Sequence, residues 1–139
     1  MLEYFNRETS RLSIGGADFE DFVRQFKTPL YVYDAEIIIR KYRRLREAMP
    51  PHVQVYYAVK SNPNLAVIRI LAELGCGFDV ASIGELAAIK KLGIEGTRVV
   101  FTGPGKSDEE IASALELGLY AFNCESENEV LRINTAAKK

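Results

Sequence analysis

The chain has 139 residues, of which 47% are hydrophobic and 27% charged, the composition of an ordinary globular protein with room for one hydrophobic core. A formal net charge of −1 gives no general reason to expect nucleic acid or an anionic membrane surface as a partner. No apolar run reaches the length of a membrane span, and the first residues lack the basic and apolar regions of a secretion signal. We therefore expect a cytoplasmic protein without a nucleic-acid or membrane partner.

The two cysteines, Cys76 and Cys124, are far apart in sequence and form no Cys-x-x-Cys pair. In a cytoplasmic protein this pattern indicates two reduced thiols rather than a disulfide or a metal site. We expect no bound metal.

Two helices and one short strand are predicted before the main repeat. A helix over Phe19–Phe26 follows the turn at Gly15-Gly16, and a strand over residues 30–33 follows Pro29. A longer helix over residues 35–49 begins after Asp34, whose carboxylate can cap its free N–H groups. We assign residues 1–28 to an N-terminal extension with a short helix, and residues 29–139 to a partial βα-barrel.

From residue 53 one pattern repeats four times: a strand rich in β-branched and aromatic residues, then an amphipathic helix. The expected strands cover residues 53–59, Gly77–Val80, 98–102 and 120–124. Three helices begin with the serine and glutamate of a reciprocal capping box: Ser82 and Glu85, Ser107 and Glu110, Ser126 and Glu129. The first three helices end in Leu-Gly, at Gly75, Gly93 and Gly118. Consecutive βα units of this kind form a parallel sheet, so the predicted class is α/β.

The fourth helix carries an apolar stripe, Val130, Leu131 and Ile133, and lacks a glycine stop. Four βα units are half of a TIM-type (β/α)8 barrel, which typically needs about 250 residues. The chain is therefore either a small open α/β sheet or the first half of such a barrel. The apolar flanks of a half barrel would favour self-association, for example as a homodimer.

Lys60 ends the first of these strands, directly before the turn Asn62-Pro63-Asn64. In a βα-barrel the C-terminal ends of the strands form the active-site face. A partly desolvated lysine amine can lose its proton and attack an aldehyde, forming a Schiff base. The structural alternative is a strand-end lysine whose amine only reaches into solvent.

Five segments follow one another along the chain: Thr28-Pro29-Leu30-Tyr31-Val32-Tyr33-Asp34, Tyr57-Ala58-Val59-Lys60-Ser61-Asn62-Pro63-Asn64, Gly77-Phe78-Asp79-Val80-Ala81-Ser82, Gly84-Glu85-Leu86, and Val100-Phe101-Thr102-Gly103-Pro104-Gly105-Lys106-Ser107. Their order and spacing resemble the diaminopimelate decarboxylase-like family of fold-type III, pyridoxal-phosphate-dependent decarboxylases. The resemblance covers nearly the whole chain from about Ile14, and it favours this branch over ornithine or arginine decarboxylases.

The resemblance implies that residues 29–139 are the N-terminal half of a cofactor-binding domain, in which Lys60 holds pyridoxal 5'-phosphate as a Schiff base and is the catalytic lysine. The cofactor ring would serve as the electron sink when CO2 leaves the substrate. Asp79 is implied to position Lys60 or balance its charge, with a strand-end hydrogen bond as the alternative. Ser82 is a candidate cofactor contact, although a helix cap explains it as well. Gly103-Pro104-Gly105 resembles a phosphate loop, but a turn before the next helix is an equal explanation.

The implied activity is that of a carboxy-lyase in lysine biosynthesis, which converts a small amino acid, meso-diaminopimelate, to lysine and CO2. Other site residues of the family, including a ring-stacking histidine, lie beyond residue 139, so we expect this chain alone to be incomplete and inactive. Two alternatives stay open. One is a pyridoxal-phosphate-binding racemase or cofactor-handling barrel protein. The other is an inactive truncated fragment that acts at most as a scaffold or self-associating domain.

Overall fold

A four-stranded parallel sheet forms the centre of the structure, a computed structural model that describes residues 12–138. Its strands lie in the order β3 (Tyr56–Ala58), β4 (Gly77–Val80), β5 (Val99–Phe101) and β6 (Ala121–Phe122). Each strand is followed by a helix: α3 (Leu65–Glu73), α4 (Ile83–Lys91), α5 (Asp108–Leu117) and α6 (Glu127–Ala137). The predicted α/β class with consecutive βα units is confirmed.

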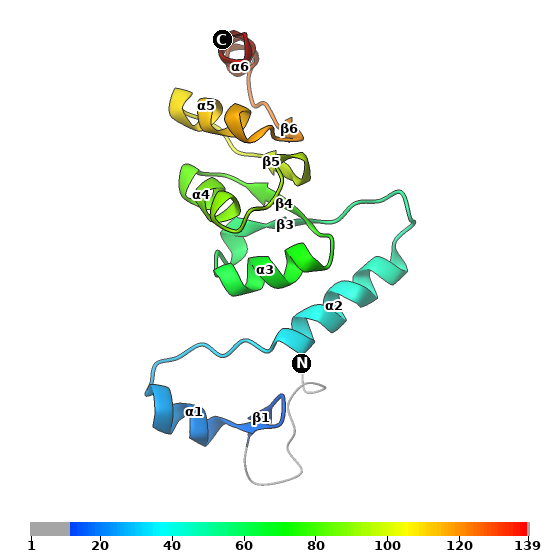
Figure 1. Cartoon of the computed structure of the whole chain (residues 1–139), viewed down its shortest axis with the longest axis vertical. Helices are drawn as coiled ribbons and strands as arrows, with labels where there is room; N and C mark the ends of the chain where they lie inside the picture. The colour runs from blue at the N-terminus through cyan, green and yellow to red at the C-terminus, as the bar shows by residue number, and fades with distance from the viewer. Residues whose placement is uncertain (1–11, 139) are drawn as a thin grey trace.

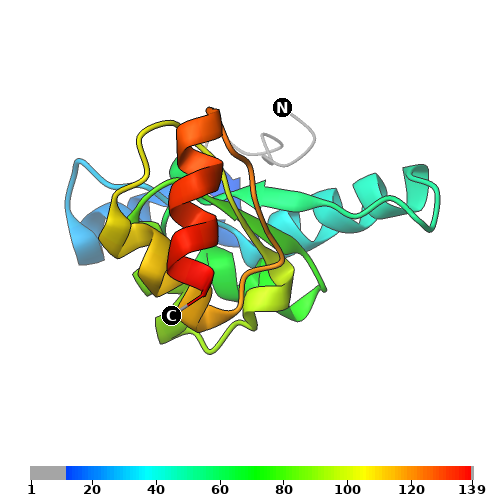
Figure 2. The same cartoon turned by 90° about the horizontal axis from the view of Figure 1, so that it is seen from above.

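The elements before the sheet are a hairpin and two helices. The hairpin joins β1 (Ser13–Ile14) to β2 (Ala17–Asp18), and α1 (Phe19–Phe26) and α2 (Ala35–Ala48) follow. The turn glycine Gly15 lies against Asp34, the residue that caps α2, so closely that a Cβ at Gly15 would collide with its carboxylate. Figure 1 shows α2 beside α3 and, at the end of the molecule that carries the C-terminus, α6 beside α5, while α1 and the hairpin lie beyond α2 at the opposite end. Figure 2 gives the view from above, with α6 in front of the sheet.

The hydrophobic core lies between the sheet and the helices α3, α4 and α5. Side chains alternate along β4, so Phe78 and Val80 are fully buried in this core while Asp79 between them points to the other face. Val99 and Phe101 of β5 continue the same buried layer. The helices complete it with apolar residues at helical spacing: Val67, Ile68, Leu71, Leu86, Ile89 and Ala114. We call the face opposite the helices the inner face.

The prediction of a strand over residues 30–33 is wrong. Within the described residues this segment is in neither a helix nor a strand, and Tyr31 is 89% exposed. Extended apolar sequence becomes a strand only when a partner supplies the ladder hydrogen bonds.

The strand predicted over residues 53–59 is present but shorter. Its ladder to β4 runs only from Tyr56 to Ala58, and the chain then turns into a 3-10 segment, Val59–Ser61. The last two strands are shortened in the same way, whereas β4 has the predicted bounds.

The three predicted helix caps form, but only one has the full reciprocal pattern. Ser107 and Glu110 make a complete capping box at α5. At α4 and α6 the serine caps the helix as predicted, while the glutamate side chain accepts from the residue before the serine, Ala81 or Glu125. The glycine stops are confirmed, since all three have positive φ.

The structure tests two further expectations only in part. Residues 1–11 of the N-terminal extension and Lys139 lie outside the described residues, so the division at residue 28 stays a prediction. Among residues 12–138, no helix has both the length and the apolar character required to cross a bilayer.

Candidate active site

All four parallel strands end at the same edge of the sheet, which we call the carboxyl edge. Lys60 follows β3, Ser82 follows β4, Thr102 follows β5 and Asn123 follows β6. Parallel strands bring their C-terminal ends together, so residues far apart in the chain become neighbours there. The structure therefore brings Lys60, Asp79 and Ser82 to adjacent strand ends, as the sequence predicted.

Asp79 lies on the inner face, one strand away from the segment that carries Lys60. Its register partner is Ala58, two residues before Lys60. Asp79 is half-buried, and its Oδ1 atom is fully buried without a hydrogen-bond partner among the described residues. A buried carboxylate oxygen without a donor is costly, so this atom is a reason to expect a ligand or a further group at the site.

Lys60 occupies the 3-10 segment Val59–Ser61 and is exposed to solvent at the carboxyl edge. The residues around it are fixed: Val59 is fully buried, and the Ser61 hydroxyl donates to the Ala58 carbonyl at 2.7 Å. A rigid turn that presents an accessible amine suits covalent attachment of an aldehyde group. The role of Lys60 itself stays a prediction.

Ser82 caps α4, because its side-chain oxygen accepts from the Glu85 N–H at 3.3 Å. This hydrogen bond confirms the structural explanation of the residue. The hydroxyl hydrogen is still available as a donor, so a cofactor contact stays a prediction.

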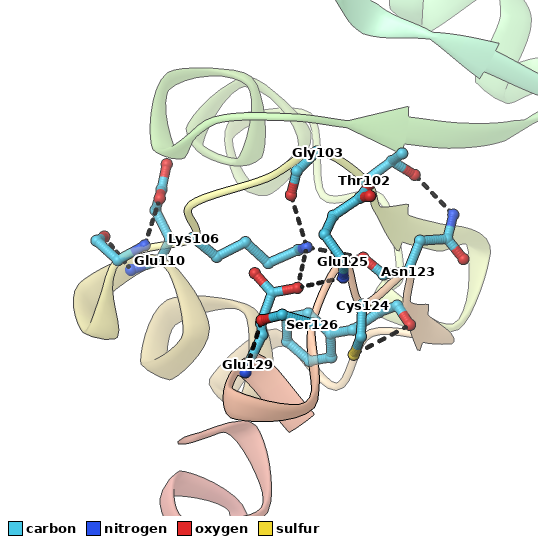
Figure 3. Close-up of polar contacts among 11 residues, drawn as sticks. Thr102, Gly103, Lys106, Glu110, Asn123, Cys124, Glu125, Ser126 and Glu129 are labelled. Carbon is cyan, nitrogen blue, oxygen red and sulfur yellow. Dashed lines mark hydrogen bonds and ion pairs between the residues drawn. The ribbon is translucent and has the colours of Figure 1, made fainter. Parts of the chain in front are cut away.

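The sequence reasoning missed a buried ion pair beside this edge, shown in Figure 3. Lys106 Nζ lies 3.1 Å from Glu129 Oε2, with side chains only 1% and 5% exposed. The same Nζ donates to the carbonyls of Gly103 and Asn123, each at 2.8 Å. It also lies 5.7 Å from the centroid of the Phe101 ring.

Glu129 is held in its charged form by this arrangement. Its Oε2 atom accepts from the Glu125 N–H at 2.9 Å, and this bond, together with Lys106, keeps the pKa of the Glu129 carboxyl below its ordinary value against the opposing effect of burial. The sequence does show that Lys106 follows a Gly-Pro-Gly turn and that Glu129 lies in the first turn of an amphipathic helix. Nothing in the sequence, however, showed that the two residues meet.

The buried position of Lys106 bears on the structural interpretation of Gly103-Pro104-Gly105. Lys106 closes the turn, because its amine donates back to the Gly103 carbonyl at 2.8 Å. The segment is a turn before the cap of α5, and a phosphate contact by its backbone stays a prediction.

Two residues of this part of the site have the chemistry needed to hold pyridoxal phosphate. Lys60 supplies an accessible amine at a strand end, and Asp79 supplies a buried carboxylate oxygen that has no donor. No cluster of metal-ligating side chains is found within residues 12–138.

Comparison with known proteins gives consistent matches. The family described as "Pyridoxal-dependent decarboxylase, pyridoxal binding domain" matches residues 35–139. Diaminopimelate decarboxylase of Vibrio cholerae is 40% identical over 98% of this chain and 33% of its own length. L-glutamyl-[BtrI acyl-carrier protein] decarboxylase of Niallia circulans is 34% identical over 92% of this chain and 30% of its own length. The chain thus spans about a third of the relatives it matches.

Solved structures agree with this result. Diaminopimelate decarboxylase of M. jannaschii superposes with a TM-score of 0.92 at 38% identity, over 98% of this chain and 33% of that one. The likeness confirms the fold expected from the sequence, consecutive βα units of the first half of a TIM-type (β/α)8 barrel.

Proposed function

Because the chain belongs to the pyridoxal-dependent decarboxylases, through their pyridoxal binding domain, we propose that it is the N-terminal, cofactor-binding part of an amino-acid decarboxylase most like diaminopimelate decarboxylase. The reaction would remove one carboxylate of meso-diaminopimelate as CO2 and leave lysine. The observation that carries this proposal is the placement of Lys60 and Asp79 on adjacent strands at the carboxyl edge.

Lys60 would hold the cofactor, because its exposed amine stands where a barrel presents its reactive groups. Lys60 Nζ would be the atom that joins the cofactor's aldehyde carbon, with the aldehyde oxygen lost as water. When bound, the cofactor supplies an electron sink for the charge left by the departing CO2.

Asp79 would place a negative charge beside the Lys60 attachment point. Its buried Oδ1 has no donor among the described residues, so a hydrogen-bond donor or positive charge at the loaded site would be accepted at little cost. Ser82, already fixed as a cap of α4, would offer its hydroxyl hydrogen to the cofactor from the same edge.

We propose meso-diaminopimelate, a small amino acid, as the substrate, because the relatives from Vibrio cholerae, Campylobacter jejuni and Pseudomonas aeruginosa are diaminopimelate decarboxylases. The Niallia circulans relative favours a second candidate, an amino acid linked to a carrier protein. Since the chain spans about a third of these relatives, we propose that these 139 residues can hold the cofactor but do not decarboxylate alone.

The test is to incubate the chain with pyridoxal phosphate, reduce with borohydride, and map the pyridoxyl adduct by peptide mass. We expect the label to concentrate on Lys60, to disappear in Lys60→Ala, and to persist in Lys91→Ala, which removes an exposed lysine of α4. A label spread over the exposed lysines and unchanged by Lys60→Ala would contradict the proposal and favour the inactive-scaffold alternative.

A further inference from the structure

The Lys106 ammonium has used all of its hydrogen-bonding capacity inside the protein. A lysine carries three N–H donors, and those of Lys106 meet the Gly103 carbonyl, the Asn123 carbonyl and Glu129 Oε2. With its side chain 1% exposed, this cation is not available to a ligand. Lys106 can therefore affect the site only through the groups to which it donates.

Those groups belong to two different βα units. Gly103 lies in the loop after β5, Asn123 lies directly after β6, and Glu129 lies in the first turn of α6. Glu129 in turn accepts from the Glu125 N–H in the β6–α6 loop. One buried nitrogen atom therefore ties the ends of two neighbouring strands to the start of a helix, as Figure 3 shows.

The strand ends held in this way present two polar side chains on the inner face. Phe101 and Phe122 stack with their ring centroids 6.2 Å apart on the helix-covered side, so the residues after them, Thr102 and Asn123, face the other way. The Asn123 side-chain N–H donates to Thr102 Oγ1 at 2.7 Å. Within the described chain this leaves Asn123 Oδ1 as an acceptor and the Thr102 hydroxyl hydrogen as a donor.

We propose that Lys106 is a positioning residue: its buried ammonium fixes the ends of β5 and β6 so that the Thr102–Asn123 pair faces the group attached to Lys60. Thr102 and Asn123 lie at the carboxyl edge, each two residues after an inner-face residue of its own strand, Val100 or Ala121. These two residues are in register with Asp79 of β4. It would hydrogen-bond polar atoms of the cofactor or of the amino acid joined to it. This inference rests on the proposed function.

The first test needs no cofactor. Removing Lys106 alone would leave Glu129 as a buried unpaired charge and strongly destabilise the fold. The variant is therefore Lys106→Met with Glu129→Gln, which removes both charges together. In an NMR spectrum of the labelled chain, we expect the Asn123 side-chain amide to move to the position of a solvated amide and to exchange faster with water. An unchanged Asn123 amide would overturn the proposal.

The second test measures the pyridoxal phosphate concentration that gives half-maximal labelling of Lys60. We expect it to rise about three- to tenfold in the Lys106→Met/Glu129→Gln variant, the effect of one misplaced hydrogen bond. Asn123→Ala should give a similar rise, and combining all three substitutions should give no more than either change alone, because they break the same interaction.

A matched control separates positioning from general loss of stability. Ile89→Val removes one methyl group from the core side of α4, far from the carboxyl edge, and should lower stability without moving the labelling midpoint. The positioning role would be overturned if the labelling midpoint rose equally in Ile89→Val. It would also be overturned if the rise in the triple variant were the product of the rises caused by Asn123→Ala and by Lys106→Met/Glu129→Gln. Absence of selective Lys60 labelling in the unmodified chain would overturn the proposed function instead, while the Asn123 amide still decides whether Lys106 positions it.

Discussion

At the scale of single residues, the polar groups near the carboxyl edge differ in how well their hydrogen-bonding capacity is satisfied. Lys106 and Glu129 are buried and fully paired, whereas the buried Asp79 Oδ1 has no donor among residues 12–138. A paired buried charge holds the fold in one arrangement, while an unpaired carboxylate oxygen is a cost to stability that a bound group can remove. The first pair is therefore structural support, and Asp79 is where we expect a ligand.

Asp79→Asn should separate stability from cofactor binding. The amide has the same shape without the charge, so the thermal midpoint should stay the same or rise. The rise would correspond to an increase of up to about 1 kcal/mol in the free energy of unfolding. Labelling of Lys60 by pyridoxal phosphate should need a concentration about three- to tenfold higher, because the site loses a charged hydrogen bond. A melting curve and the borohydride assay on the same sample measure both. A variant that is less stable but labelled normally would assign Asp79 to the fold instead.

Glu129 should make the fold sensitive to acid. Its pKa is lower in the folded chain than its ordinary value near 4.5, so the folded state binds fewer protons than the unfolded state. The stabilisation is complete above that ordinary value and is lost as the pH falls through the lower, folded-state pKa. Denaturant unfolding between pH 7 and pH 3 should therefore show a steeper loss of stability than in the Lys106→Met/Glu129→Gln variant, which has no proton to gain at this position and leaves no buried unpaired charge. Parallel pH curves for the two chains would contradict this assignment.

At the scale of elements, each of the first three βα units is defined by a cap at the start of its helix and a glycine just after its end. The serine caps fix where α4, α5 and α6 begin, and Gly118, with φ of 68°, ends α5 in the left-handed conformation. These local signals make the helix bounds largely independent of the rest of the molecule. Strand bounds depend instead on the ladder, which is why β3, β5 and β6 are shorter than predicted.

Two glycine substitutions test this division of roles. Gly118→Ala should destabilise the chain by about 1 kcal/mol, because alanine in the left-handed region is strained even though the space around it is open. Gly84→Ala, in the first turn of α4 and also in open space, should be neutral or stabilise by up to about 1 kcal/mol, because its conformation is helical. Urea unfolding of both variants against the unchanged chain measures the difference. Equal effects would show that side-chain volume, not backbone conformation, matters at these positions.

At the scale of the whole molecule, the structure has apolar side chains without a covering layer. Near its β6–α6 end Tyr120 is 67%, Val130 50% and Leu131 64% exposed, so the apolar stripe predicted on α6 is present but mostly exposed. In a (β/α)8 barrel, such a helix would lie against the next unit of the ring. A patch of this kind is a favourable site for contact with other apolar surface.

We therefore expect the isolated chain to associate with itself as its concentration rises. Sedimentation or light scattering should give a mass above the 15.6 kDa of the single chain at high concentration. Val130→Glu with Leu131→Lys should restore the single-chain mass and keep the thermal midpoint, since both side chains are already exposed. A single-chain mass at every concentration would exclude this surface as a site of self-association.

The resemblance to a known family supplied Asp79 and Ser82 as candidate site residues beside Lys60, while the sequence by itself determined the order of the βα units, the starts of their helices and the glycine stops of the first three. These depend on local signals: caps, glycines and apolar periodicity, which act within a few residues. Only the tertiary structure decided which extended segments become strands, that Asp79 Oδ1 lacks a donor, and that Lys106 meets Glu129. Each of these depends on residues 20 or more positions apart, because hydrogen-bond partners and burial are supplied by neighbouring strands, and no local pattern specifies them.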